Sequence, residues 1–138
     1  MKILNKKLRQ EFARPGRCEW CLKFCRKREP HHLRTRTPEL TVRINLFSVG
    51  STPLWCCACH TEIGNGKIDR SEVLSRVAIR ERVKVDDISA CMDLFRRLVR
   101  PTPSALQASL ASLAPSARVL AERELSEARI PRIPKTSH

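Results

Sequence analysis

The sequence predicts a small α+β protein, and three observations lead to this prediction. The chain has 138 residues, which suits one small domain with extensions. The segment from Cys18 to Gly66 is irregular, with cysteines and histidines at both ends and short extended stretches around residues 32–35 and 41–47. Beyond it, apolar residues recur at three- and four-residue spacing, which is typical of helices. We therefore expect a cysteine-rich segment with short strands, followed by helices.

A short basic helix is predicted before the cysteine-rich segment, so that residues 1–17 form a basic N-terminal extension. The pair Pro15-Gly16 is expected to end this helix. The apolar residues at helical spacing between positions 2 and 13 are Ile3, Leu4, Leu8 and Phe12.

A helix over residues 69–82 is predicted after the cysteine-rich segment. Asp69 followed by Glu72 resembles a capping box, a pattern that begins a helix. The apolar side of this helix is supplied by Val73, Leu74 and Val77, with Ile79 as a further candidate.

A further helix is predicted over residues 86–99, so that residues 71–100 contribute helices that pack against the cysteine-rich segment. Asp86 or Asp87 can cap this helix, and it is expected to end before Pro101. Its apolar stripe consists of Ile88, Cys91, Met92, Phe95, Leu98 and Val99.

Residues 101–138 are predicted to form a linker and a helical, partly disordered tail. The linker is the run Pro101 to Ser104, and Pro115 interrupts the helical pattern before it resumes over residues 119–128. Residues 130–138 are expected to be disordered. One helical face of this tail either packs onto the same chain or drives a weak homodimer; its residues are Leu106, Leu110 and Leu113.

The charge of the chain points to a polyanionic partner. The formal net charge is +13, and the first 36 residues hold twelve of the 27 Lys and Arg against three Glu. Concentrated positive charge attracts nucleic acid, because each neutralised phosphate releases a counterion. Aromatic residues make up only 4% of the chain, which argues against a stacking platform for single strands. The expected partner is therefore double-stranded DNA, and the alternative is a solvated basic face without a ligand.

Composition also excludes several classes of protein. No run approaches the roughly 20 apolar residues of a membrane span, and no apolar stretch follows the basic N-terminus as in a signal peptide. The chain is too short for a large enzyme with a deep substrate pocket. We expect a cytoplasmic protein without a membrane partner.

Four of the seven cysteines form two CxxC pairs, Cys18-x2-Cys21 and Cys56-x2-Cys59. Two such pairs complete a tetrahedral Zn²⁺ shell, so the sequence predicts a structural zinc site. Disulfides are the rival interpretation, and they fit a chain without a secretory signal poorly.

The choice of zinc ligands leaves alternatives open. Cys57 adjoins Cys56, so that Cys57-x-Cys59 is a conceivable second half of the site, and Cys25 can also compete. Cys91 lies on an apolar helical stripe and is predicted to be a core residue.

Histidines and an asparagine lie between and beside the two pairs. His31 and His32 follow the first pair, Asn45 comes next, and His60 directly follows Cys59. A lone histidine or asparagine is more often an ordinary surface, core or turn residue. What makes these residues candidates for a functional site is their order along a segment that zinc would hold together.

Residues 18–70 resemble the HNH endonuclease family, whose ββα-metal fold carries its motif in this order, often framed by two CxxC pairs. The resemblance implies a zinc-stapled HNH nuclease module over residues 18–70 that hydrolyses phosphodiester bonds in DNA. Residues 65–68 are similar to phage-type members, which implies the cytoplasm of a prokaryotic or phage-infected cell. The chain has Gly64 where many members have a second histidine.

The resemblance also assigns roles to individual residues. His32 is the expected general base, and Asn45 orients that base or holds the loop between the strands. His31 and His60 are the expected ligands of a catalytic divalent cation, Mg²⁺ or another. A non-catalytic zinc-ribbon DNA-binding protein or small regulator is the alternative. The residues expected to contact DNA are Lys27, Arg28, Arg34 and Arg36.

Overall fold

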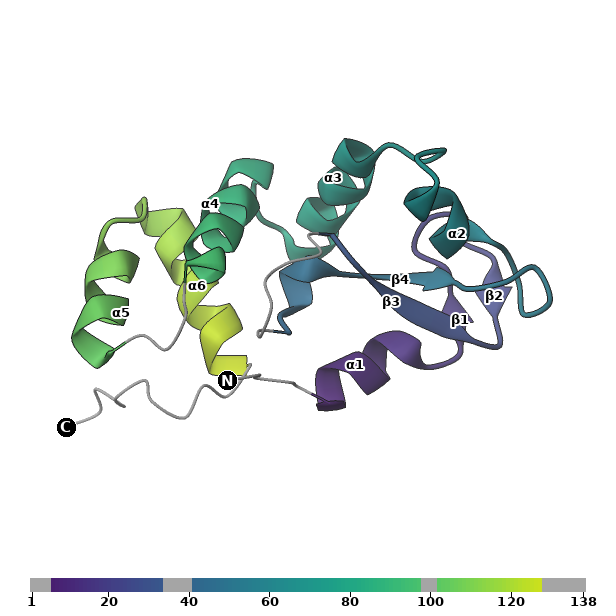
Figure 1. Ribbon diagram of the computed structural model, residues 1–138, viewed down its shortest axis with the longest axis horizontal. Helices are drawn as coiled ribbons and strands as arrows, with labels where there is room; N and C mark the ends of the chain where they lie inside the picture. Colours follow the sequence, from purple (N-terminus) through teal and green to yellow (C-terminus); the bar gives the residue numbers. More distant parts are fainter. Residues whose placement is uncertain (1–5, 34–40, 98–101, 128–138) are drawn as a thin grey trace.

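The computed structural model describes residues 6–33, 41–97 and 102–127, and it confirms a small α+β fold (Figure 1). Two short hairpins with the cysteines beside them come early in the chain, and five helices follow. The elements are α1 (Lys6–Ala13), β1 (Gly16–Arg17), β2 (Phe24–Cys25), β3 (Arg28–His32), the 3-10 helix η1 (Arg43–Asn45), β4 (Leu46–Gly50), α2 (Cys59–Gly64), α3 (Arg70–Glu81), α4 (Val85–Arg96), α5 (Pro103–Ala111) and α6 (Pro115–Glu127).

The strands form two separate antiparallel pairs, β1 with β2 and β3 with β4. In the longer pair, His31 lies opposite Phe47 and His32 opposite Leu46. Strand β4 begins later than the predicted stretch at residues 41–47, because the Asn45 N–H donates to the Val42 carbonyl at 3.1 Å and bends the chain just before β4. Strand β3 ends at His32, and residues 34–35 of the other predicted stretch lie outside the described residues. Every residue of β4 is buried, so this strand lies inside the fold.

Helix α1 confirms the predicted N-terminal helix within the described residues, which begin at Lys6. Leu8 and Phe12 are buried and form a small cluster with Leu46 of β4. Ile3 and Leu4, which were expected on the same apolar side, lie outside the described residues.

The predicted start of α3 is confirmed, and that of α4 is wrong. The Asp69 side chain caps α3 by accepting from the Ser71 N–H at 2.9 Å. Helix α4 instead begins after Lys84, so Asp86 and Asp87 occupy its first turn. Negative charge is favourable there, because the N-terminus of a helix carries partial positive charge.

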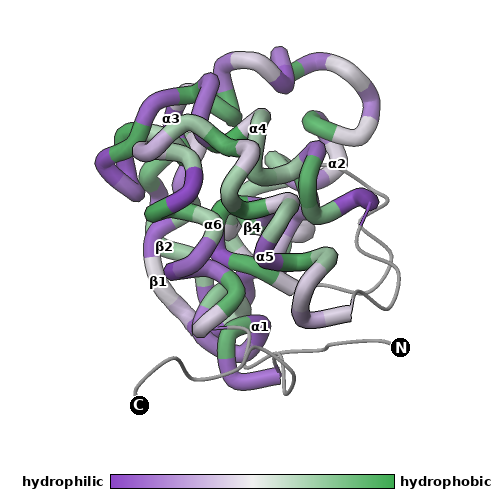
Figure 2. Tube along the Cα trace, turned by 90° about the vertical axis from the view of Figure 1, so that its left-hand side faces the viewer, coloured by the Kyte–Doolittle hydropathy of each residue, from purple (hydrophilic) through white to green (hydrophobic). Residues whose placement is uncertain are grey.

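Helices α5 and α6 pack back onto the chain itself. Leu106 and Leu110 are buried in the main core, together with residues of α4 and α6. Helix α6 begins at Pro115 rather than at residue 119, since proline is well accommodated in the first turn of a helix. Figure 2 shows hydrophobic and hydrophilic residues alternating along these helices, as expected for elements with one buried side.

The main core runs without interruption from the cysteine-rich region to the last helix. It contains Cys18 and Cys25 near the hairpins, and Cys91 of α4, which is buried as predicted. No helix among the described residues is both long and apolar enough to cross a membrane.

Two arginines connect the strands to the helices. The Arg80 guanidinium of α3 binds the Glu19 carboxylate and donates to the carbonyl oxygens of Arg43 and Leu46 at 2.8 and 2.9 Å. Arg43 pairs with Glu11 of α1 at 2.5 Å and with Glu127 of α6 at 3.1 Å. These contacts fix the positions of the first and last described helices around the turn that precedes β4.

Candidate metal centre and histidine cluster

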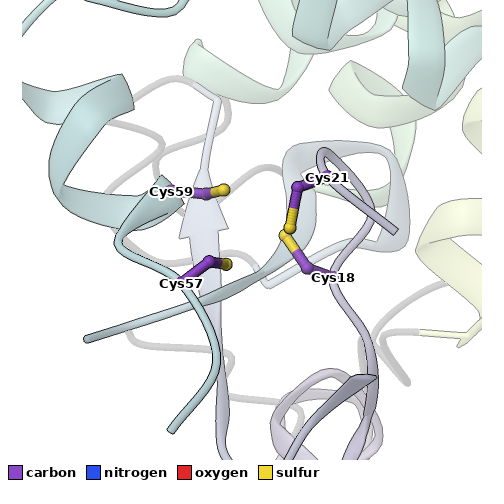
Figure 3. A group of neighbouring side chains, drawn as sticks. All are labelled: Cys18, Cys21, Cys57 and Cys59. Atoms are coloured by element: carbon purple, nitrogen blue, oxygen red, sulfur yellow. The ribbon is translucent and has the colours of Figure 1, made fainter. Parts of the chain in front are cut away.

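Four cysteine sulfurs converge on one point, those of Cys18, Cys21, Cys57 and Cys59. All four lie within 4.8 Å of one another. Cys18 and Cys21 belong to the loop between β1 and β2, whereas Cys57 lies just before α2 and Cys59 is its first residue (Figure 3). Four thiolates at this spacing can hold a structural Zn²⁺ ion with tetrahedral geometry.

The fourth cysteine of this group is Cys57, where the CxxC spacing predicted Cys56. The two residues are adjacent, and the Cys57 sulfur groups with those of Cys18, Cys21 and Cys59, whereas the Cys56 sulfur groups with those of Cys25 and Cys57. Cys56 is joined to Cys25 in a disulfide, contrary to the expectation of reduced cysteines throughout. The strand that carries Cys25 lies beside the loop that carries Cys56, because the Arg26 N–H donates to the Trp55 carbonyl at 3.2 Å.

Gly50 permits this packing. A Cβ atom at Gly50 would lie 2.6 Å from the Cys57 sulfur, 2.9 Å from the Cys57 carbonyl and 3.2 Å from the Cys25 sulfur. The end of β4 therefore passes against both cysteines only because no side chain is present at this position.

The pKa shifts of three of these cysteines, Cys18, Cys57 and Cys59, differ in direction. Burial alone would raise the pKa of Cys18, but backbone N–H groups, including those of Cys21 and Gly50, favour its thiolate and lower that pKa. Burial and the neighbouring thiols raise the pKa of Cys59, and burial raises that of Cys57. Thiolates this close repel one another, and a divalent cation between them removes that repulsion.

A second cluster consists of Glu29, His31 and His60. The rings of His31 and His60 meet edge to face, with centroids 5.3 Å apart, and the Glu29 Oε2 lies 3.1 Å from the His60 Nδ1. Glu29 and His31 share one side of β3 because side chains alternate along a strand. Burial, then the charges of His60, Arg70 and His32, lower the pKa of His31 to about 4. His31 is therefore neutral at pH 7, the form in which an imidazole binds a metal.

His32 and Asn45, the predicted catalytic pair, lie next to this cluster. His32 is the last residue of β3, and alternation along the strand takes its side chain off the side that Glu29 and His31 share. Burial, then the charges of Arg9 and His60, lower its pKa. Asn45 is buried, and its carbonyl accepts from the Leu33 N–H at 2.9 Å. Its backbone thus holds the ends of β3 and β4 together.

The residues predicted to contact DNA differ in their exposure and contacts, and two of them lie outside the described residues. Lys27 is exposed. Arg28 is half-buried and donates to the carbonyl oxygens of Arg14 and Arg17 at 2.6 and 3.0 Å, so it braces the turn between α1 and β1. Arg34 and Arg36 lie outside the described residues.

Glu29 is the residue that sequence reasoning missed. The available signal was its position two residues before His31, since that spacing places two residues on the same side of a strand. Within the described ranges, only cysteine groups bring three or more potential ligand atoms within 4.8 Å of one another.

The fold and the site together define a small α+β protein with a four-cysteine group that can hold a metal ion. Comparison of the chain with protein-family models, with curated proteins and with solved structures finds no match.

Proposed function

We propose that this protein is a metal-dependent DNA endonuclease of the HNH type. The observation that carries the proposal is the contact between His31 and His60, with Glu29 bound to His60, beside the four-cysteine group. The antiparallel pair of β3 and β4, followed by α2, has the order and pairing that a ββα-metal fold requires.

His31 and His60 are the residues proposed to hold the catalytic cation. Their two imidazoles, with a carboxylate beside them, are donors that suit a divalent metal. If the His60 Nδ1–H donates to Glu29, the His60 Nε2 is left free to bind the cation. A divalent cation, when bound, polarises the scissile phosphate and stabilises the leaving oxygen.

His32 is the proposed general base. Its lowered pKa keeps the imidazole neutral at pH 7, so it can accept a proton from the attacking water. The net charge of +13 supports a polyanionic substrate, since it favours association with phosphates at long range.

Two observations favour the alternative, a non-catalytic zinc-ribbon DNA-binding protein. Gly64 occupies the position where many HNH proteins have a second histidine. Within the described residues, the Glu29, His31 and His60 donor atoms are also less tightly grouped than the four sulfurs. The two functions differ in one outcome, which is whether DNA is cut.

Cleavage of supercoiled plasmid tests the proposal. With Mg²⁺ or Mn²⁺ we expect the wild type to produce nicked or linear DNA, and chelator to stop the reaction. His32→Ala and His60→Ala should lower the rate roughly 100-fold or more. The control Thr61→Ala changes an exposed residue of the same helix and should cut normally. DNA binding without cleavage under both metals would leave only the alternative.

Metal analysis of the purified protein tests the zinc site separately. We expect about one Zn per chain, as for a four-thiolate structural site. Far less zinc, with folding unchanged in Cys18→Ser, would rule the site out. Either result leaves the cleavage experiment to be judged independently.

A further inference from the structure

Large hydrophobic side chains are exposed in the β1–β2 hairpin and in the loop before α2, beside the four cysteines. Among the described residues six large hydrophobic side chains are exposed, and four of them lie in these two segments. We call this group the knuckle patch; its residues, with their exposed fractions, are Leu22 (61%), Phe24 (63%), Leu54 (83%) and Trp55 (39%).

The two halves of the knuckle patch come from neighbouring segments, although they lie about thirty residues apart in the sequence. The Arg26 N–H donates to the Trp55 carbonyl at 3.2 Å, and the adjoining Cys25 is joined to Cys56. Figure 1 shows the loop before α2 running beside β2. The side chains next to these contacts, Phe24 and Trp55, are thus presented from neighbouring segments.

Leu22 stands in a conformation that glycine would adopt at lower cost. Its φ is 67°, in the left-handed region, which costs a residue with a Cβ roughly 1–2 kcal/mol. Its N–H donates to the Cys18 carbonyl and its own carbonyl accepts from the Arg17 side chain, and glycine would keep both contacts. These two backbone contacts therefore do not depend on the leucine side chain, most of which is exposed.

The surroundings of the knuckle patch are positively charged. Arg17, which pairs with Phe24 across the β1–β2 hairpin, is exposed, as are Lys23, Arg26 and Lys27. One acid of the same β1–β2 hairpin, Glu19, has its carboxylate bound by the Arg80 guanidinium and the Ser48 N–H. An apolar, partly aromatic centre with a cationic rim is complementary to single-stranded nucleic acid, whose phosphates are negatively charged and whose bases are flat rings that can stack on aromatic side chains.

We propose that the knuckle patch binds unpaired bases of DNA, although the low aromatic content of the chain as a whole argued against a stacking platform for single strands. This inference rests on the proposed function and names its substrate class: DNA in which a few bases are unpaired beside a duplex. Phe24 and Trp55 stack on the bases, Leu22 and Leu54 extend the apolar surface, and the basic rim contacts phosphates. An intact duplex engages only the rim, because its bases are covered by their neighbours in the stack.

Fluorescence anisotropy tests whether the knuckle patch binds unpaired bases. No divalent metal is added, so that the DNA is not cut. The probes are a labelled blunt duplex and the same duplex with an eight-nucleotide single-stranded gap. Stacking contributes about 1–3 kcal/mol per base, so Phe24→Ala and Trp55→Ala should each weaken binding to the gapped duplex about 5- to 100-fold. Binding to the blunt duplex should change less than about twofold. The matched control is Ile79→Ala, which removes an exposed apolar side chain of α3.

Tryptophan emission gives a second readout that does not depend on affinity. The chain has two tryptophans, so Trp20→Phe leaves Trp55 as the single emitter. We expect oligo(dT) to quench this emission, and Trp55→Phe to retain most of the preference for gapped DNA. Zinc content and circular dichroism equal to wild type show that each variant is folded.

Three results would overturn the proposal: equal affinity for the two DNAs, an equal loss on both in the variants, or no quenching at saturating oligo(dT). A dimer that Trp55→Ala converts to monomer, with DNA binding unchanged, would assign the surface to a second copy of the chain instead. Preference for gapped DNA without cleavage supports the knuckle patch and removes the nuclease. Cleavage of plasmid together with equal affinity for the blunt and the gapped duplex supports the nuclease and overturns the knuckle patch.

Discussion

The buried carboxyl group of Glu124 predicts that the protein loses stability as the pH rises towards neutrality. Glu124 of α6 is 1% exposed, and its Oε1 accepts from the Ile44 N–H at 2.6 Å. Its Oε2 makes no hydrogen bond within the described residues, and the Arg123 Nε lies 3.9 Å away. Burial raises the pKa of Glu124 from 4.5 to about 7.

The direction and the size of the effect follow from proton linkage. Between pH 4.5 and about 7 the native protein holds a proton on Glu124 that the unfolded chain has released. The free energy of unfolding therefore falls as the pH rises through this range. Raising a pKa from 4.5 to about 7 corresponds to about 3 kcal/mol, at about 1.4 kcal/mol per pH unit. Glu124→Gln keeps the acceptor for Ile44 without the charge, so it should remove this loss.

Urea unfolding at pH 5, 6, 7 and 8 measures the prediction as a difference between variants, which cancels the pH dependence of zinc binding. Glu124→Gln should gain on the wild type as the pH rises, by up to about 3 kcal/mol at pH 8. Glu122→Gln, on the exposed side of the same helix, should show a difference that does not vary with pH. A Glu124→Gln difference that is constant from pH 5 to 8, or negative at pH 8, would refute the reasoning.

Three further predictions concern the metal centre and its support. Gly50→Ala places a Cβ 2.6 Å from the Cys57 sulfur and should weaken zinc binding at least about tenfold in a chelator competition. The control Gly64→Ala adds a Cβ that meets nothing within 4 Å and should leave zinc binding unchanged. Cys57→Ser should bring zinc well below one per chain while Cys56→Ser retains it, and the opposite order would contradict the ligand set. Arg80→Ala should lower the free energy of unfolding, measured by urea denaturation, by roughly 1.5–3 kcal/mol, because the Arg80 guanidinium binds one carboxylate and two backbone carbonyls. A loss of less than about 0.5 kcal/mol would contradict this role of Arg80.

Features set by neighbouring residues could be predicted from the sequence. The cap at Asp69 depends only on the residues that follow it, and the Cys18-x2-Cys21 pair depends on one short loop. The choice between Cys56 and Cys57 could not be made in this way. The two have the same chemistry, and their directions are set by where the loop meets β2 and the end of β4.

The start of α4 could not be predicted either, because Asp86 and Asp87 both carry a helix-start signal. Helix α3 is instead capped by Arg82 in a left-handed conformation, and α4 begins directly after Lys84. Contacts between distant parts of the chain could not be predicted from local patterns. The bond between Glu124 and Ile44 joins residues 80 apart in the sequence. Nothing in the local pattern around either residue distinguishes it from an ordinary helical glutamate or a buried isoleucine.

The hydrogen bond between the Ile44 N–H and Glu124 also constrains the order in which parts of the chain can fold during synthesis. The turn before β4 is made early, yet the carboxylate that accepts from the Ile44 N–H and the Glu127 that pairs with Arg43 are added 80 residues or more later. While it is still on the ribosome, the strand pair beside the cysteines therefore lacks its final partners. The four cysteines that can hold a metal ion all lie at or before position 59, so a metal ion bound there would stabilise the nascent chain before α6 docks.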